Sequence, residues 1–156
     1  MTSQEDEHST VLASDSAVAW AEARFSQLRV VADSLSQIQQ VSPASLAYLG
    51  DAVYELYMRT CYLLPARRPS DYHHQVVAQV RAESQANHLR SLQPHLTELE
   101  LEILRRGRNA ATVTSRRLAP KIYQQATSLE TLMGYLFLTN PQRLTQLLAL
   151  LELDPH

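Results

Sequence analysis

The sequence predicts an all-α protein built as a helical bundle. Its 156 residues are 45% hydrophobic and include only three glycines, while helix formers such as Leu, Ala, Gln, Glu and Arg dominate. Apolar residues recur at helical spacing in several segments, and no stretch of any length shows the alternation of a half-buried strand. A chain of this length is close to the usual size of one domain.

The N-terminal segment differs in composition from the rest of the chain. Residues 1–14 are polar, acidic and without periodicity, which predicts a disordered tail. Residues 17–40 have helical composition, but their apolar residues are spaced irregularly. We therefore expect a disordered and partly helical extension over residues 1–40, followed by a helical domain over residues 41–156.

The first helix of that domain is predicted over residues 43–61. Ser42 is a suitable N-cap, Pro43 suits the first turn, and Pro65 lies beyond the end. Small and apolar residues cover most of its circumference, which indicates packing on several sides. The stripe expected to face the core is Leu46, Leu49, Val53, Leu56 and Tyr57.

Prolines and capping signals place the next two helices. One is expected to run without interruption from Pro69 to a residue before Pro94. The other is expected to begin after Thr97, because Thr97 and Glu100 fit a capping box. Gly107 suits the position just beyond the C-terminus of that helix.

The last third of the chain contains a loop and two helices. Residues 107–117 are small, polar and basic without a clear period, so we expect a loop there. A helix should run from about residue 118 to Asn140 and include the apolar stretch LETLMGYLFL. A final amphipathic helix is predicted over residues 141–152, with leucines at helical spacing.

Asp51 is the first candidate for chemistry. In LAYLGDAVYEL its small and apolar neighbours predict a largely buried position, and Glu55 and Arg59 share its helix face. A buried carboxylate needs a cation or hydrogen-bond donors nearby. Two partners meet this need: Arg59 in an ordinary ion pair, or a divalent metal ion.

Glu130 is the second candidate, an isolated charge in an otherwise uncharged segment. Thr127 and Glu130 also fit a capping box, in which the glutamate would only close the start of a helix. The local pattern leaves both interpretations open.

Two of the three glycines connect these candidates. Gly50 directly precedes Asp51, and Gly134 lies one turn after Glu130, both in predicted helix interiors. A glycine there costs about 1 kcal/mol relative to alanine, which a close crossing of two helices would offset. If the helices cross at the glycines, Asp51 and Glu130 face a gap suited to Mg²⁺ or Mn²⁺.

A basic segment provides a candidate nucleic-acid interface despite the net charge of −2. Six basic residues and no acidic residue lie between Arg105 and Lys121. The structural interpretation is that they complement a helix dipole, and the functional one is that they bind phosphates. No aromatic residue is interleaved, so a duplex is favoured over unpaired bases. The candidate RNA-binding residues are Arg105, Arg106, Arg108, Asn109, Arg116, Arg117 and Lys121.

Other familiar patterns are absent from the sequence. It has no zinc-binding spacing, phosphate-binding loop or dinucleotide motif, so no organic cofactor is expected. The single cysteine, Cys61, cannot form an internal disulfide. With no leader and no apolar run of about 18 residues, the sequence predicts no membrane association and a cytoplasmic location, or the stroma of an organelle.

Three motifs together identify a family resemblance. LAYLGDAVYELYMR, then RRGRNA, then LETLMGYLFL closely resemble the Mini-ribonuclease III family, compact relatives of ribonuclease III that lack its double-stranded-RNA-binding domain. The match covers residues 43–152 and keeps the order and approximate spacing of the motifs.

The resemblance implies a function as well as a fold. It implies a ribonuclease III catalytic fold for residues 41–156, a homodimer, and Mg²⁺-dependent hydrolysis of double-stranded RNA that leaves 5′-phosphate and 3′-hydroxyl ends. In bacteria the implied target is the precursor of large-subunit (23S) ribosomal RNA. Asp51 corresponds to the principal catalytic and metal-binding aspartate, Glu130 to the catalytic and metal-binding glutamate, and Glu55 to a supporting residue.

The sequence departs from full-length ribonuclease III at two positions. Ala47 replaces a glutamate four residues before the signature aspartate, and Thr127 replaces an aspartate three residues before the metal-binding glutamate. Fewer carboxylates predict weaker metal affinity. Two alternatives to an enzyme follow: a non-catalytic RNA-binding or ribosome-assembly protein with the same fold, and a helical interaction module without RNA affinity.

Overall fold

The computed structural model describes residues 35–111 and 119–155, together with Ala19, Ala23 and Gln27. Contacts between Cα atoms divide the chain into two units, Met1–Ser34 and Leu35–His156. The predicted acidic tail therefore lies outside the described residues. In the described part every regular element is helical and none is a strand, which confirms the all-α prediction.

The described residues of the second unit form seven α-helices and one 3₁₀ turn. In order they are α2 (Leu35–Gln39), α3 (Pro43–Cys61), α4 (Pro69–Val80), α5 (Ala82–Leu92), η1 (Gln93–His95), α6 (Glu98–Ala110), α7 (Pro120–Thr139) and α8 (Pro141–Ala149). None of these helices is both long and apolar enough to cross a membrane.

Two of the predicted helix starts are present with their caps. The Ser42 side chain accepts a hydrogen bond from the Ser45 amide, 3.1 Å away, at the start of α3. At the start of α6 the capping box is complete. The Glu100 amide donates to Thr97 Oγ1 over 3.2 Å, and the Thr97 amide donates to Glu100 Oε1 over 3.0 Å.

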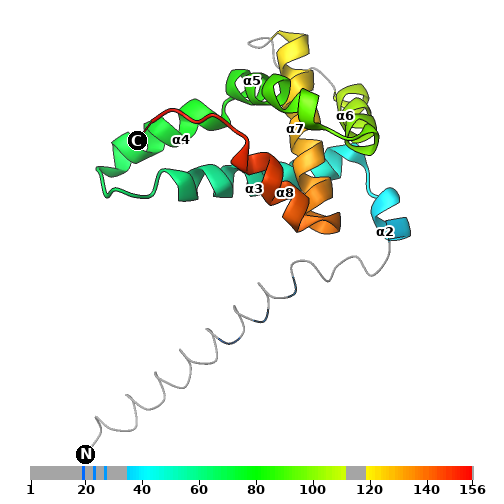
Figure 1. The fold of residues 1–156 in the computed structure, drawn as a ribbon, viewed down its shortest axis with the longest axis horizontal. Coiled ribbons are helices and arrows are strands. Elements are labelled where there is room, and N and C mark those ends of the chain that lie inside the picture. Colours follow the sequence, from blue (N-terminus) through cyan, green and yellow to red (C-terminus); the bar gives the residue numbers. More distant parts are fainter. Residues whose placement is uncertain (1–18, 20–22, 24–26, 28–34, 112–118, 156) are drawn as a thin grey trace, which may run out of the picture. The chain divides into compact units, whose positions relative to one another are not determined.

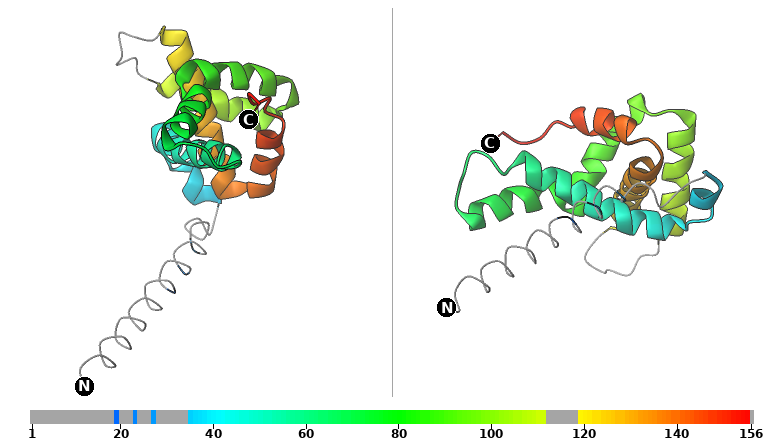
Figure 2. Two further views of the ribbon diagram at one scale, coloured as in Figure 1. Left: turned by 90° about the vertical axis from the view of Figure 1, so that its left-hand side faces the viewer. Right: turned by 90° about the horizontal axis from the view of Figure 1, so that it is seen from below.

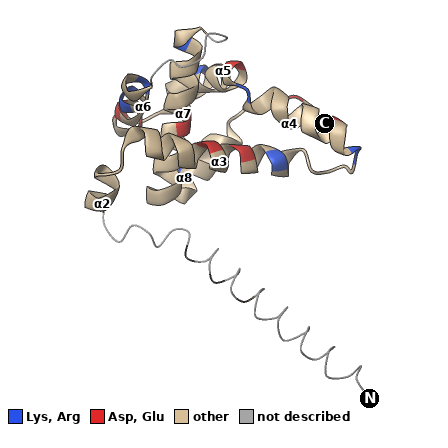
Figure 3. Ribbon diagram, turned by 180° about the vertical axis from the view of Figure 1, so that it is seen from behind, with Lys and Arg blue, Asp and Glu red and all other residues tan. Residues whose placement is uncertain are grey.

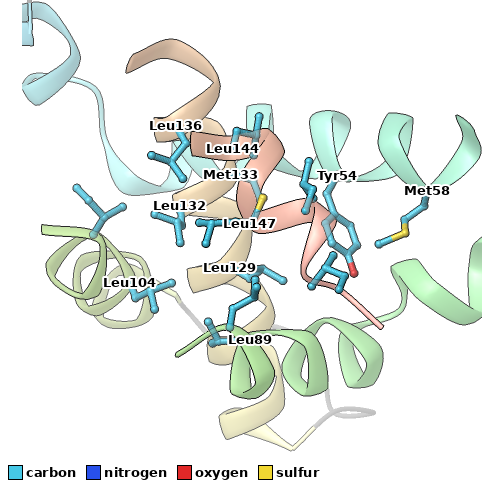
Figure 4. Close-up of a cluster of buried hydrophobic side chains, with 14 of the residues drawn as sticks. Tyr54, Met58, Leu89, Leu104, Leu129, Leu132, Met133, Leu136, Leu144 and Leu147 are labelled. Atoms are coloured by element: carbon cyan, nitrogen blue, oxygen red, sulfur yellow. The ribbon is translucent and has the colours of Figure 1, made fainter. Parts of the chain in front are cut away.

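Helix α7 lies at the centre of the second unit and packs against α3, α5, α6 and α8 (Figures 1 and 2). The core around it receives side chains from all these helices, including Tyr54, Leu89, Leu104, Leu129 and Leu147 (Figure 4). Such extensive burial of apolar surface supplies the main stabilisation of the fold. It also fixes α7, the helix that carries Glu130, against α3, the helix that carries Asp51.

The crossing of α3 and α7 confirms the role predicted for the two glycines. A Cβ atom on Gly50 would lie 1.7 Å from the main-chain oxygen of Glu130, and one on Gly134 would lie 2.0 Å from the oxygen of Leu46. Only glycine permits this separation of the two backbones.

The buried face of α3 differs from the expected stripe. It consists of Leu46, Ala47, Gly50, Tyr54 and Met58, whereas Leu56 is 62% exposed. The expected stripe followed the largest apolar residues. Of that stripe only Leu46 is buried, and the buried face instead combines the small residues Ala47 and Gly50, which allow α7 to come close, with the large side chains of Tyr54 and Met58.

Three predicted helix boundaries were wrong. The helix expected to start at Pro69 is interrupted at Arg81, whose extended backbone (φ −63°, ψ 154°) separates α4 from α5. Helix α6 continues past Gly107, which is buried against α7 instead of ending the helix; a Cβ there would lie 2.5 Å from Thr131 Oγ1. Helix α8 ends at Ala149, before the predicted residue 152.

Candidate active site

A cleft lies beside the crossing of α3 and α7, and it contains both candidate carboxylates. It encloses about 270 Å³, room for several water molecules. Its lining comes from α3, from the end of α6 and from α7: Ala44, Ala47, Tyr48, Asp51, Ala110, Ala111, Tyr123, Thr127 and Glu130.

Asp51 is exposed at this cleft, so the expected burial was wrong. It follows Gly50, where α7 covers the helix, but its own side chain lies on the open side of the crossing. Partial burial and the nearby charge of Glu55 raise the pKa of the Asp51 carboxyl. Arg59 does not pair with Asp51. Its Nη2 lies 2.7 Å from Glu55 Oε1 in an ion pair on the helix surface.

Glu130 lies deeper in the cleft, in the middle of α7. This position removes the capping-box interpretation, because Thr127 and Glu130 both follow several turns of the same helix. The hydroxyl of Thr131 donates to the Thr127 carbonyl over 2.8 Å, as is common within a helix. Burial, together with the charge of Asp51, raises the pKa of Glu130 to about 7, against a partial opposing effect of a hydrogen bond from Gln85.

Gln85 is the site residue that the sequence did not indicate. It is only 3% exposed, and its Nε2 donates a hydrogen bond of 3.0 Å to Glu130 Oε1. Gln85 lies in a segment that the sequence predicted to be one uninterrupted helix. The break at Arg81, which no glycine or proline announces, turns α5 so that Gln85 reaches α7.

The donor set of the cleft suits a hard divalent cation. Asp51 and Glu130 supply carboxylate oxygens, the ligands that Mg²⁺ and Mn²⁺ prefer. The two charges repel each other enough to affect the pKa of Glu130, and no described arginine or lysine lines the cleft. Within the described ranges no three residues among His, Cys, Asp and Glu are grouped as a metal site. Two protein carboxylates therefore form the described donor set.

The two departures noted in the sequence both lie at this cleft. Ala47 and Thr127 line it together with Asp51 and Glu130. The residues that replace carboxylates of full-length ribonuclease III are therefore in position to affect the same donor set. Their methyl and hydroxyl groups cannot add negative charge to it.

Two of the basic residues predicted to bind phosphates are instead paired with an acidic side chain of the same helix. Arg105 makes a bidentate ion pair with Glu102, with contacts of 2.8 and 2.6 Å, and Arg106 Nε lies 3.5 Å from the same carboxylate. Arg108, Asn109 and Lys121 are exposed. Both blue and red segments are accordingly present on α6 in Figure 3. Arg116 and Arg117 lie outside the described residues.

Comparisons with known proteins find relatives of this chain by sequence and by fold. Residues 44–141 match the ribonuclease III domain family. The chain is similar to the Mini-ribonuclease 3 of a Synechocystis strain (62% identity over 116 residues, 74% of this chain and 81% of the relative). It is also similar to that of Gloeobacter violaceus (50% identity over 120 residues, 77% and 89%). A crystal structure of a Fusobacterium nucleatum protein matches with a TM-score of 0.66 at 27% identity, covering 72% of this chain and 92% of that one.

Proposed function

The chain belongs to the Mini-ribonuclease 3 family and is an endoribonuclease, and we propose that it hydrolyses double-stranded RNA with Mg²⁺ held by Asp51 and Glu130. The observation that carries the proposal is the cleft at the α3 and α7 crossing, which two carboxylates from distant segments line together and which no arginine or lysine of the described residues lines. We assign the catalytic domain to residues 41–156.

The proposed chemistry divides between the two carboxylates by their depth in the cleft. Bound there, Mg²⁺ (or Mn²⁺) supplies an acidified water and neutralises charge on the phosphate. Glu130, held between α3, α5 and α7, provides a fixed oxygen donor at the base. Asp51, exposed at the mouth, provides the oxygen that reaches toward the phosphate. The oxygen of a water molecule forms a bond to phosphorus as the P–O3′ bond breaks, and O3′ gains a proton, which leaves 5′-phosphate and 3′-hydroxyl ends.

Substrate binding is assigned to the basic residues beside the cleft. Ala110 and Ala111, at the end of α6, line it, so Arg108 and Asn109 of the same helix end are close in sequence to its wall. Arginine matches phosphate oxygens with two parallel donors, which suits the backbone of a duplex. Lys121, in the first turn of α7, is assigned to the same surface.

A homodimer and a ribosomal RNA substrate complete the proposal. In a two-fold dimer each subunit presents one cleft, so the two strands of a duplex are cut by different subunits. The biological substrate we propose is the precursor of 23S ribosomal RNA. The family resemblance of the sequence motifs supports both points.

The decisive experiment incubates a long RNA duplex with the wild type and with Asp51→Asn, with Mg²⁺ or EDTA, and analyses the ends of the products. We expect the wild type to cleave only with Mg²⁺, and Asp51→Asn to bind the duplex without cleaving it. Asp71→Asn, the same change at an exposed aspartate of α4, should retain full activity. Duplex binding without any cleavage by the wild type would favour the non-catalytic RNA-binding alternative, and no binding at all would favour the interaction module.

A further inference from the structure

The break between α4 and α5 leaves main-chain groups that need partners. Arg81 is extended, so helical hydrogen bonding stops around it; its amide still donates to the Val77 carbonyl over 3.1 Å, and its carbonyl accepts from the Gln85 amide over 3.0 Å. The carbonyls of Ala78 and Val80 accept side-chain donors instead. Ser84 Oγ donates to Ala78, and Gln85 Nε2 donates to Val80 over 2.9 Å.

The side-chain nitrogen of Gln85 therefore donates two hydrogen bonds. One proton of Nε2 serves the Val80 carbonyl, and the other serves Glu130 Oε1 at 3.0 Å. Because the Val80 carbonyl and the ionised Glu130 carboxylate only accept, the Gln85 side chain cannot exchange its nitrogen and oxygen without placing oxygen against oxygen twice. The interruption between α4 and α5, through the Val80 carbonyl, and the Glu130 carboxylate in the cleft thus fix the same side chain, Gln85.

The oxygen end of this amide differs from the nitrogen end. Gln85 Oε1 is buried and accepts no hydrogen bond from a described residue. Buried polar groups in proteins nearly always have a partner, either a protein group or an ordered water molecule. The hydrogen bonds that the Gln85 side chain makes to described residues are therefore the two donated by Nε2, to Val80 and to Glu130.

We propose that Gln85 is a positioning residue that holds the Glu130 carboxylate in the orientation required to bind the divalent metal ion. The inference rests on the proposed function, because it concerns the same metal site. Gln85 fixes Oε1 of Glu130, which leaves Oε2 as the oxygen available to the ion. Side chains that orient metal ligands in this way commonly change metal affinity when they are removed.

The test is direct Mn²⁺ binding, measured by the electron paramagnetic resonance of free Mn²⁺, without RNA. Gln85→Met keeps the length of the side chain and removes both donors, and we expect it to bind Mn²⁺ about 10- to 100-fold more weakly. In cleavage assays KM for the duplex should stay unchanged, while kcat falls at low Mn²⁺ and recovers at high Mn²⁺.

Two matched variants separate positioning from stability. Ser84→Ala removes the two hydrogen bonds of Ser84 Oγ at the same break, one donated to the Ala78 carbonyl and one accepted from Arg81 Nε, and leaves the bond from Gln85 to Glu130 in place. Gln79→Met makes the same replacement at another buried glutamine, which is 4% exposed and donates to Asp154 Oδ2 over 2.8 Å. Both should bind Mn²⁺ within twofold of the wild type. An equal loss in Ser84→Ala, or unchanged binding in Gln85→Met, overturns the inference.

A second measurement uses the wild type alone and does not depend on the variant folding. In ¹⁵N NMR spectra the side-chain amide of Gln85 should shift as Mg²⁺ is added, while that of Gln79 should not. Saturable binding with a stationary Gln85 amide overturns this inference and leaves the proposed metal site intact. If the wild type does not bind Mn²⁺ or Mg²⁺ at all, the proposed function fails together with it.

Discussion

Gly50 of α3 lies directly against the main-chain carbonyl of Glu130 in α7, so close that a Cβ atom would sit 1.7 Å from that oxygen. The residue next to Gly50 is Asp51, and the oxygen belongs to the residue that carries the second carboxylate. The contact that joins the two helices therefore also fixes the site, without any intervening side chain.

Gly50→Ala should damage both the fold and the site. The obstructing atoms are main chain, which cannot move aside as a flexible side chain can, so we expect a loss of about 3 kcal/mol in the free energy of unfolding. Urea denaturation followed by circular dichroism measures it. Ala52→Ser, at an exposed position of the same helix, should change it by less than about 0.5 kcal/mol. A stable Gly50→Ala protein would contradict the crossing.

Glu130→Gln should stabilise the metal-free protein at alkaline pH. The pKa of Glu130 is about 7 in the folded chain against an ordinary value of 4.5, so the folded state binds its proton more tightly than the unfolded state. The free energy of unfolding therefore falls as pH rises from about 4.5 to about 7, by about 3 kcal/mol from this group. A neutral glutamine removes that loss.

The corresponding measurement is the thermal midpoint of wild type and Glu130→Gln in EDTA at pH 5 and pH 8. The variant should melt higher at pH 8 and nearly equally at pH 5, and in a separate assay with Mg²⁺ it should cleave no RNA. Glu83→Gln, at an exposed position of α5, serves as the control and should show no such difference. Equal midpoints of Glu130→Gln and wild type at pH 8 would argue against a desolvated carboxylate.

Arg108→Gln should weaken duplex binding more than Arg105→Gln. Arg108 is exposed and has no ion pair with a described residue, whereas both contacts of Arg105 are to Glu102. We expect loss of Arg108 to raise KM and to reduce the slope of log K against log salt by about 1. Arg106→Gln should lie between them, since its contact with Glu102 is longer. Equal effects at all three positions would show that Glu102 does not restrain Arg105.

Thr127→Asp should tighten metal binding. Thr127 lines the cleft beside Asp51 and Glu130, so an aspartate there adds a third carboxylate to the described donor set. Calorimetric titration with Mg²⁺ should show higher affinity, and the metal-free protein should become less stable because three like charges then share the cleft. Thr60→Asp, at an exposed position near the end of α3, is a control that should leave Mg²⁺ binding unchanged.

Arg143→Met should be far more costly than Arg59→Met. Glu100 is almost completely buried, and Arg143 Nη2 lies 2.8 Å from its Oε1 and also donates to the carbonyl of His95. That pairing holds the pKa of Glu100 below its ordinary value. Removing the arginine leaves a buried charge, at a cost of about 3 kcal/mol. The pair of Arg59 and Glu55 is on the surface, and its loss should cost less than about 1 kcal/mol by urea denaturation.

Local signals predicted much of the helical framework. Ser42, Thr97 and the prolines at residues 43, 69 and 141 mark helix starts by hydrogen bonding and backbone restriction within a few residues, so the sequence contains that information. The crossing at Gly50 and Gly134 was also predictable, because glycine inside a helix needs a reason. The roles of Asp51 and Glu130 remain predictions.

What the sequence did not reveal depends on contacts between distant segments. The break at Arg81 has no local breaker and depends on donors from Ser84 and Gln85 that satisfy the freed carbonyls. Gly107 resembles a helix end by composition, yet α7 packs on it as the helix continues. Glu102 lies three residues before Arg105 and so outside the basic segment of residues 105–121. Its ion pairs with Arg105 and Arg106 are therefore seen only in the structure.

The sharing of Glu102 by two arginines has a consequence for how RNA arrives. The chain carries a net charge of −2, so its field at long range does not attract a polyanion. In the proposed complex a duplex reaches α6 by diffusion, and Arg105 can bind its phosphates only after Glu102 is displaced, an exchange of one anion for another. Association should therefore be slow for a nucleic-acid enzyme, and discrimination between substrates should arise after contact, from shape and dwell time.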